Sequence, residues 1–145
     1  MSVIVSVDGV IGTRAAIQLA AREAAYRRCP LVAVASYAGD STLGAPAAQS
    51  ISTLDTAREL QAATSQGLAK AVQDALGDGA GAVQHQLVRG LTGRSFVAAV
   101  REARAELVVL TARGTMSLLL GAVSQYVLRH APCPVLVVPE GTSAT

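Results

Sequence analysis

Aromatic residues are scarce in this sequence: its 145 residues include no Trp, one Phe and three Tyr, although 51% of all residues are hydrophobic. A core must therefore be aliphatic, built from Val, Leu, Ile and Ala. Ala-rich helices packed on Val-rich strands fit this composition. The length predicts a single domain over 1–145, large enough to bury roughly 68 to 70% of its unfolded surface without cross-links.

Long apolar runs and dense basic clusters are also missing. No apolar run approaches the ~18 residues of a membrane helix, and the N-terminus lacks the basic segment that precedes the apolar part of a signal peptide. Lys70 is the only lysine and the arginines are scattered, so we expect no membrane association and no nucleic-acid binding. The expected location is the cytoplasm.

Five short runs rich in Val, Leu and Ile alternate with longer segments of helical periodicity. The predicted strands are 3–7, 31–37, 83–88, 107–110 and 135–138. The predicted helices run from Thr13 or Gly12 to about Arg27, from Thr53 to Leu76, from the cap residue Thr92 to about Ala103, and through the segment between the last two strands. The alternation predicts parallel strands joined by helices.

Glycine, proline and serine mark the connections. Pro30 is expected to stop the first helix. The glycines of 77–81 follow a helix and precede a strand, the reverse of a dinucleotide-binding loop, so we interpret them as a turn. The segment 39–52 has no periodicity and is predicted to be a mobile loop, either plain or functional. Residues 140–145, which follow Pro139, are predicted to form a tail.

The predicted fold is an α/β fold, a five-stranded parallel sheet in the order 3-2-1-4-5 with helices on both faces. In this order the direction of winding reverses between the first and fourth strands. A ligand crevice forms at such a reversal, outside the carboxyl ends of the strands. Asp8 and the turn from Thr111 to Ala122 are therefore expected side by side at the crevice.

The two cysteines, Cys29 and Cys133, begin the second and fifth strands of this arrangement. Three strand spacings separate them, about 14 Å, whereas a disulfide needs α-carbons within about 7 Å. We therefore expect two buried free thiols. The sequence has no cluster of His, Cys and Asp at the spacing of metal ligands, so we expect no metal site.

Several segments resemble the universal stress protein family over nearly the whole chain. They are 5–9 at the first strand, 87–90 at the third, and 118–124 together with 130–138 at the end, where His130-Ala131-Pro132-Cys133-Pro134 precedes an apolar strand. The resemblance implies a nucleotide-binding α/β fold similar to that of adenine nucleotide alpha hydrolases. It also implies a homodimer, often paired through the fifth strand, and a role in the stress response.

Nucleotide-binding members of the family carry Gly, two residues, Gly, nine residues, and then Gly followed by Ser or Thr. This sequence departs from the motif in three places. Thr111 occupies the position of the first Gly of the motif. Only six residues (115–120) separate Gly114 from Gly121, where the motif has nine, and Ala122 replaces the Ser or Thr. We therefore expect weak or no ATP binding, and a smaller adenine ligand such as AMP or none. The alternative is a functional ATP- or AMP-binding member with slow or no hydrolysis.

The resemblance implies roles for individual residues. Asp8 would contact the adenosine part of a nucleotide, and the backbone of Ser36 would recognise adenine. Gly114, Gly121 and the amides of Ala122 and Val123 would remain for phosphates. Arg113 beside Gly114 could hold an anion, although a solvent-facing arginine is the plainer interpretation. The candidate nucleotide site is Asp8, Ser36, Thr111, Arg113, Gly114, Gly121, Ala122, Val123 and Ser124.

Catalytic arrangements are sparse, so we expect no enzyme. Ser124, His130 and Asp8 supply the residue types of a hydrolase triad, but Ser124 and His130 are six apart on a helix and point to different sides. The Gly-x-Ser-x-Gly elbow is absent. His130 near a helix carboxyl end is better interpreted as a partner of the helix dipole.

The last strand is apolar and uncharged: Val135, Leu136, Val137 and Val138. An open edge of this kind promotes aggregation unless it is covered. Pairing with a second copy across a two-fold axis is the expected remedy, and coverage by the tail 140–145 is the alternative. A purely structural role, with 39–52 contacting another protein, also stays open. The stress signal, the partner and the physiological ligand are not specified by the sequence.

Overall fold

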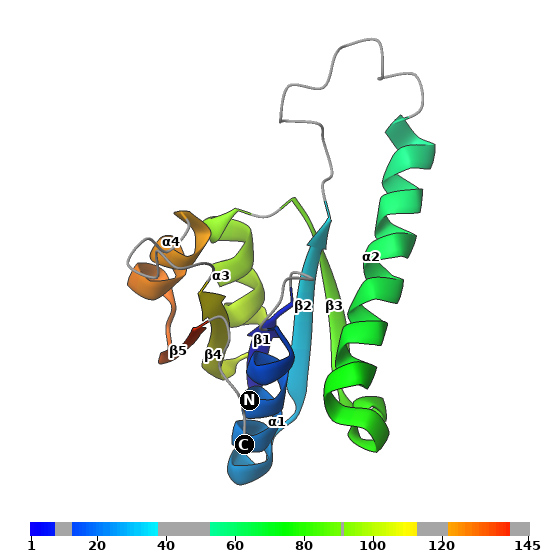
Figure 1. Ribbon diagram of the computed structural model, residues 1–145. Coiled ribbons are helices and arrows are strands. Elements are labelled where there is room, and N and C mark those ends of the chain that lie inside the picture. The colour runs from blue at the N-terminus through cyan, green and yellow to red at the C-terminus, as the bar shows by residue number, and fades with distance from the viewer. Residues whose placement is uncertain (8–12, 38–52, 91, 113–121, 140–145) are drawn as a thin grey trace.

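The structure is a computed structural model that describes residues 1–7, 13–37, 53–90, 92–112 and 122–139. The strands are β1 (Ser2–Ser6), β2 (Leu31–Tyr37), β3 (Gln84–Arg89), β4 (Ala105–Ala112) and β5 (Val135–Pro139). The α-helices are α1 (Thr13–Arg27), α2 (Thr53–Leu76), α3 (Gly93–Glu102) and α4 (Ala122–His130), and a 3-10 helix spans Gly77–Ala82. Helices and strands alternate along the chain as the sequence predicted (Figure 1).

The strands form one parallel sheet in the order β3-β2-β1-β4-β5. Val5 of β1 lies level with Ala33 of β2 and with Val109 of β4. On the far side of β4, Val109 is level with Leu136 of β5. The predicted order and the reversal between β1 and β4 are therefore confirmed.

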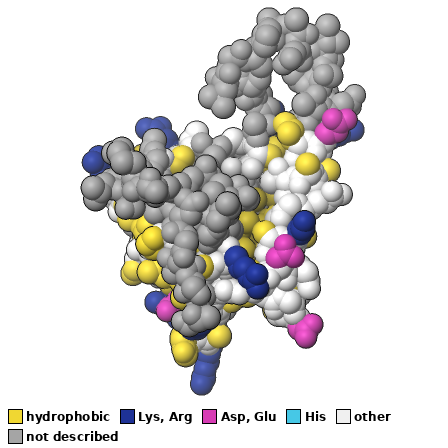
Figure 2. All heavy atoms as spheres, viewed as in Figure 1, with side chains coloured by type: hydrophobic (Ala, Val, Ile, Leu, Met, Phe, Trp, Pro, Cys, Tyr) yellow, Lys and Arg dark blue, Asp and Glu magenta, His cyan; other side chains and the backbone are white. Residues whose placement is uncertain are grey.

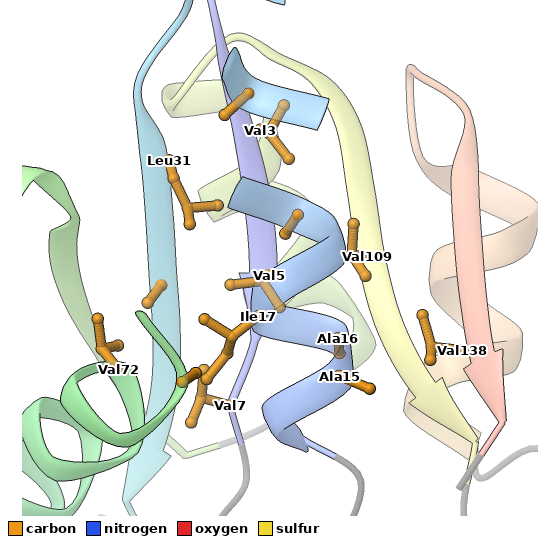
Figure 3. Close-up of a cluster of buried hydrophobic side chains, with 14 of the residues drawn as sticks. Val3, Val5, Val7, Ala15, Ala16, Ile17, Leu31, Val72, Val109 and Val138 are labelled. Carbon is orange, nitrogen blue, oxygen red and sulfur yellow. The ribbon is translucent and has the colours of Figure 1, made fainter. Parts of the chain in front are cut away.

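Helices cover both faces of the sheet, and side chains alternate between the two resulting layers. Val3, Val5 and Val109 point to the face covered by α1 and α2, where they meet Ile17 and other small aliphatic side chains (Figure 3). Ile4, Val32, Val108 and Leu110 point to the opposite face, where α3 and α4 supply Phe96, Val100 and Val127. Phe96, the one phenylalanine, is 1% exposed, so the core is aliphatic apart from this ring.

The start of α3 is fixed by a capping box. The backbone N–H of Ser95 donates to Thr92 Oγ1 at 3.0 Å, and the backbone N–H of Thr92 donates to Ser95 Oγ at 3.0 Å. Such reciprocal bonds satisfy donors that the first helical turn leaves unpaired. The prediction that Thr92 caps this helix is confirmed.

Some predicted boundaries are corrected. The glycines of 77–81 belong to a 3-10 helix, Gly77–Ala82, and not to a plain turn. Gly77 has φ +55, which lets α2 end there, and the N–H of Val83 closes the segment by donating to Ala80 O at 3.2 Å. β4 is longer than the predicted 107–110, and β1 begins and ends one residue before 3–7.

Both cysteines are free, as predicted, because β2 and β5 are three strands apart. They are half-buried, however, and not fully buried, because both lie just before their strands, where the sheet gives less cover. Burial raises the pKa of the Cys29 thiol, helped by the carboxylate of Glu106. Burial also raises the pKa of the Cys133 thiol.

Charged side chains on the face shown in Figure 2 are scattered among uncharged ones, without a continuous basic stripe. In the part of the chain that the structure describes, no helix is long and apolar enough to span a membrane.

Candidate functional site

Strands β1 and β4 separate toward their carboxyl ends. The register between them ends at Val5 and Val109. Beyond this level β1 continues beside β2, where the N–H of Val7 donates to Val34 O at 2.8 Å, while β4 continues beside β5 as far as Ala112. We call this point of divergence the β1–β4 split; it lies where the strand order reverses, the position at which open α/β sheets bind ligands.

Thr111 lies on the β4 side of the split, level with Val138 of β5. By the alternation of strand side chains it faces the α1 and α2 side, as Leu107 and Val109 do. Its Oγ1 is buried and has no hydrogen-bond partner among the described residues. An unpaired buried hydroxyl costs about 1 to 3 kcal/mol, so Thr111 presents an unsatisfied polar atom that a polar ligand could engage.

Ser36 lies near the carboxyl end of β2, level with Val88 of β3, and is half-buried. Strand β1 lies between β2 and β4, which separates Ser36 from Thr111 by two strand spacings, about 10 Å. A ligand that touched both residues would have to cross the end of β1. A ligand that contacts both residues must therefore be extended.

Helix α4 begins at Ala122 and runs back from the carboxyl end of β4 to the start of β5. Its first turn includes Val123 and Ser124, both half-buried. The side chain of Val123 packs into the cluster between the sheet and the α3–α4 layer. Val123 could therefore bind an anion through its backbone N–H but not through its side chain. Helix N-termini with free N–H groups attract anions.

The remaining predicted site residues, Asp8, Arg113, Gly114 and Gly121, lie outside the described residues. The described part of the site is therefore the β1–β4 split with Thr111, the end of β2 with Ser36, and the first turn of α4. The predicted juxtaposition of Asp8 with the glycine turn stays a prediction.

His130 lies at the end of α4, four residues after Tyr126. Its Nδ1 is 3.0 Å from the carbonyl oxygen of Tyr126, and the two rings stack with centroids 3.9 Å apart. Its position agrees with a structural role at the helix end and not with a base for Ser124. Among the described residues no three His, Cys, Asp or Glu side chains are grouped as metal ligands.

Two cavities lined by described residues lie elsewhere. One, of about 290 Å³, is apolar and lies at the amino end of the sheet beside Cys29, Leu31 and Leu76. The other, of about 360 Å³, lies between α3 and α4 beside Arg94, Arg101 and Tyr126. The second cavity was not predicted from the sequence, where the one signal for it is the seven-residue spacing of Arg94 and Arg101, two helical turns on one face.

Known proteins resemble the chain at the level of fold. A structure of universal stress protein UspA from Lactobacillus plantarum superposes with a TM-score of 0.75 at 21% identity, covering 95% of this chain and 97% of that one. A universal stress protein in complex with cAMP gives 0.69 at 24% identity, covering 97% and 98%. One from Archaeoglobus fulgidus in complex with dAMP gives 0.59 at 21%, covering 95% and 97%.

A search of curated proteins finds no match. A family model, that of the universal stress protein family, matches residues 1–139. This match covers all five strands and the four α-helices of the structure. The chain therefore belongs to the universal stress protein family.

Proposed function

We propose that this protein is a cytoplasmic stress-response binding module, without enzymatic activity, that holds an adenine mononucleotide in the β1–β4 split. The observation that carries the proposal is the buried, unpartnered hydroxyl of Thr111 at the point where β1 and β4 separate. A hydroxyl in that state is stabilised by a ligand that supplies a hydrogen-bond partner. The binding of cAMP and dAMP by two universal stress proteins of similar fold supports this choice of ligand.

The sequence favours a mononucleotide over ATP for steric reasons. A β-branched side chain at Thr111 narrows the approach to the ribose, where the family motif has Gly. The segment 115–120 is three residues shorter than the motif requires for a triphosphate. Ala122 also removes a hydroxyl donor, which costs about 0.5 to 1.5 kcal/mol.

The other candidate residues have roles in this proposal that rest on the family resemblance. The carboxylate of Asp8 would hold the adenosine part, and the backbone of Ser36 would recognise adenine. Gly114, Gly121 and the amides of Ala122 and Val123, at the start of α4, would face the phosphate. A single phosphate needs fewer of these donors than a triphosphate does.

We also propose a homodimer paired through β5. Strand β5 forms one edge of the sheet, and its Leu136 is 37% exposed. The strand has no charged side chain, whereas edge strands that stay unpaired often carry charged residues that prevent pairing with another sheet. Pairing of two copies would cover this edge.

A thermal-unfolding titration with AMP, cAMP, ADP and ATP tests the nucleotide proposal, with GMP as the control for the base. At a ligand concentration about 100 times Kd, stability should rise by ~2.7 kcal/mol. We expect AMP or cAMP to reach a given shift at a lower concentration than ATP, and GMP to give a smaller shift. No shift with any adenine nucleotide at millimolar concentration would remove the proposal.

A further inference from the structure

The groove between α3 and α4 has no role in the proposed function. It encloses about 360 Å³ and is lined by Arg94, Val97, Ala98, Arg101, Tyr126 and His130. Small-molecule sites enclose about 300 to 1,000 Å³, so the groove is large enough for a small ligand and too small for a folded partner.

Two cations line one side of the groove. Arg94 and Arg101 are seven residues apart on α3, hence on the same face and about 10 Å apart along the helix. Both side chains are exposed, and among the described residues no ion pair or side-chain hydrogen bond of either is found. None of the described residues that line the groove is a carboxylate, so the two arginines favour the binding of an anion.

A flat aromatic surface lines the other side. The Tyr126 and His130 rings are stacked at 3.9 Å with an interplanar angle of 20°. His130 Nδ1 lies 3.0 Å from Tyr126 O, so Nε2 is the ring nitrogen that would meet a polar ligand. Between the two sides, the buried Val97 provides an apolar floor.

Close packing at the start of α3 holds α3 and α4 together beside the groove. A Cβ placed on Gly93 would lie 2.5 Å from Cβ and Cγ of Tyr126. This is too close for any side chain, so only glycine fits at this position. Tyr126 is therefore packed directly against the backbone at the start of α3, on the same groove that Arg94 and Arg101 line. A side chain held by close packing loses little entropy when a ligand binds, whereas the exposed arginine side chains must be ordered by the ligand.

We propose that the α3–α4 groove binds a small organic anion, a flat ring that carries a phosphate or carboxylate group. The anionic group pairs with Arg94 and Arg101, since guanidinium groups form charge-assisted, bidentate bonds with both anions. The ring lies against the Tyr126–His130 stack. The proposal does not depend on nucleotide binding in the β1–β4 split, which lies at the ends of other strands.

An NMR titration of the full 14.7 kDa chain tests it. The probes are phenyl phosphate and benzoate. The controls are inorganic phosphate, which lacks the ring, and benzyl alcohol, which lacks the charge. We expect phenyl phosphate or benzoate to shift the amide signals of α3 and α4, and each matched probe to bind at least about 10-fold more weakly, because a charge-assisted contact or a ring contact is lost.

Matched charge variants complete the test. R94Q/R101Q removes the two groove cations, and R58Q/K70Q removes two exposed cations of α2. We expect binding to weaken at least about 10-fold in the first variant and to remain unchanged in the second. All four side chains are exposed, so both variants should keep the wild-type circular dichroism.

Three results would overturn the proposal. The first is the absence of amide shifts in α3 and α4 at about 10 mM probe, a concentration well above a dissociation constant of roughly 1 mM. The second is equal loss of binding in R94Q/R101Q and R58Q/K70Q, which would indicate a general charge effect. The third is a shift pattern centred on Ser36 and Thr111, which would assign the probe to the split and leave the proposed nucleotide function intact.

Discussion

Gly93 and Gly67 show how differently two helical glycines can act. At Gly93 a Cβ would meet Tyr126 at 2.5 Å, whereas at Gly67 in α2 nothing lies within 4 Å of an added Cβ. The first glycine permits the close approach of α3 and α4. The second only adds flexibility to an exposed part of α2, because glycine lowers helix stability relative to alanine.

Substitution of each glycine by alanine should therefore change stability in opposite directions. Gly93→Ala should lower the free energy of unfolding by about 1 to 3 kcal/mol, because α3 and α4 must move apart. Gly67→Ala should raise it by about 0.5 to 1 kcal/mol. Urea unfolding of the two variants measures both effects, and equal effects of the same sign would contradict the packing described for Tyr126.

The hydroxyl of Thr111 has a counterpart in Ser2, another buried hydroxyl. Ser2 is 3% exposed, and its Oγ donates to Ala103 O at 2.8 Å, whereas Thr111 Oγ1 has no partner among the described residues. Thr111→Val keeps the shape and removes the unpaired group, so the ligand-free protein should gain about 1 kcal/mol or more. Ser2→Ala should lose about 1 kcal/mol.

Thermal and urea unfolding of these two variants without ligand provide the comparison. A loss of stability in Thr111→Val as large as that in Ser2→Ala would mean that the Thr111 hydroxyl is already paired. That result would remove the observation on which the nucleotide proposal rests.

At the scale of elements, the two edge strands of the sheet differ in character. Strand β3 is polar, and its Gln84 and His85 are exposed. Strand β5 is apolar and presents Leu136. Polar and charged edges resist pairing with other sheets, so β5 is the edge that we expect to pair.

Leu136→Glu should convert the proposed dimer to a monomer, because a carboxylate would be buried against its symmetry mate. Gln84→Glu places the same charge on the other edge and should leave the oligomeric state unchanged. Light scattering after size-exclusion chromatography measures both masses. A wild-type protein that is monomeric at every concentration, or a dimer unaffected by Leu136→Glu, would contradict pairing through β5.

For the whole molecule, strand order and most elements followed from the sequence because strong local signals delimit them. Pro30 and Gly77 bound β2 and α2, and the predicted ranges 31–37 and 53–76 agree with the structure. The apolar runs at 107–110 and 135–138 predicted neighbouring parallel strands, which β4 and β5 are. The reversal between β1 and β4 followed from this order.

Features that depend on tertiary contacts were not predictable in this way. The 3-10 helix at Gly77–Ala82 has no hydrophobic period to reveal it. The groove between α3 and α4 requires Gly93 to meet Tyr126, a contact that no spacing encodes. The unpaired state of the Thr111 hydroxyl depends on where β1 and β4 separate, which the order of strands alone does not specify.

The two thiols give the whole molecule a defined pH dependence. Burial raises the pKa of Cys29 and Cys133, so the folded chain keeps protons that the unfolded chain releases above the ordinary thiol pKa of about 8.5. The free energy of unfolding should therefore fall as pH rises from below that value through the raised pKa values of the folded state. The C29A/C133A variant should lose this part of the dependence; urea unfolding at several pH values compares the two proteins, and identical pH profiles would contradict it.

Calorimetric titration of AMP and ATP into wild-type protein and the T111G/A122S variant measures whether Thr111 and Ala122 limit the size of the nucleotide that binds. If Thr111 narrows an adenine-nucleotide crevice at the β1–β4 split, the wild type should bind AMP more tightly than ATP, and the variant should bind ATP at least about 10-fold more tightly than the wild type does, a gain of ~1.4 kcal/mol. Absence of heat with either nucleotide in both proteins, or an ATP affinity that the two substitutions leave unchanged, would contradict the account.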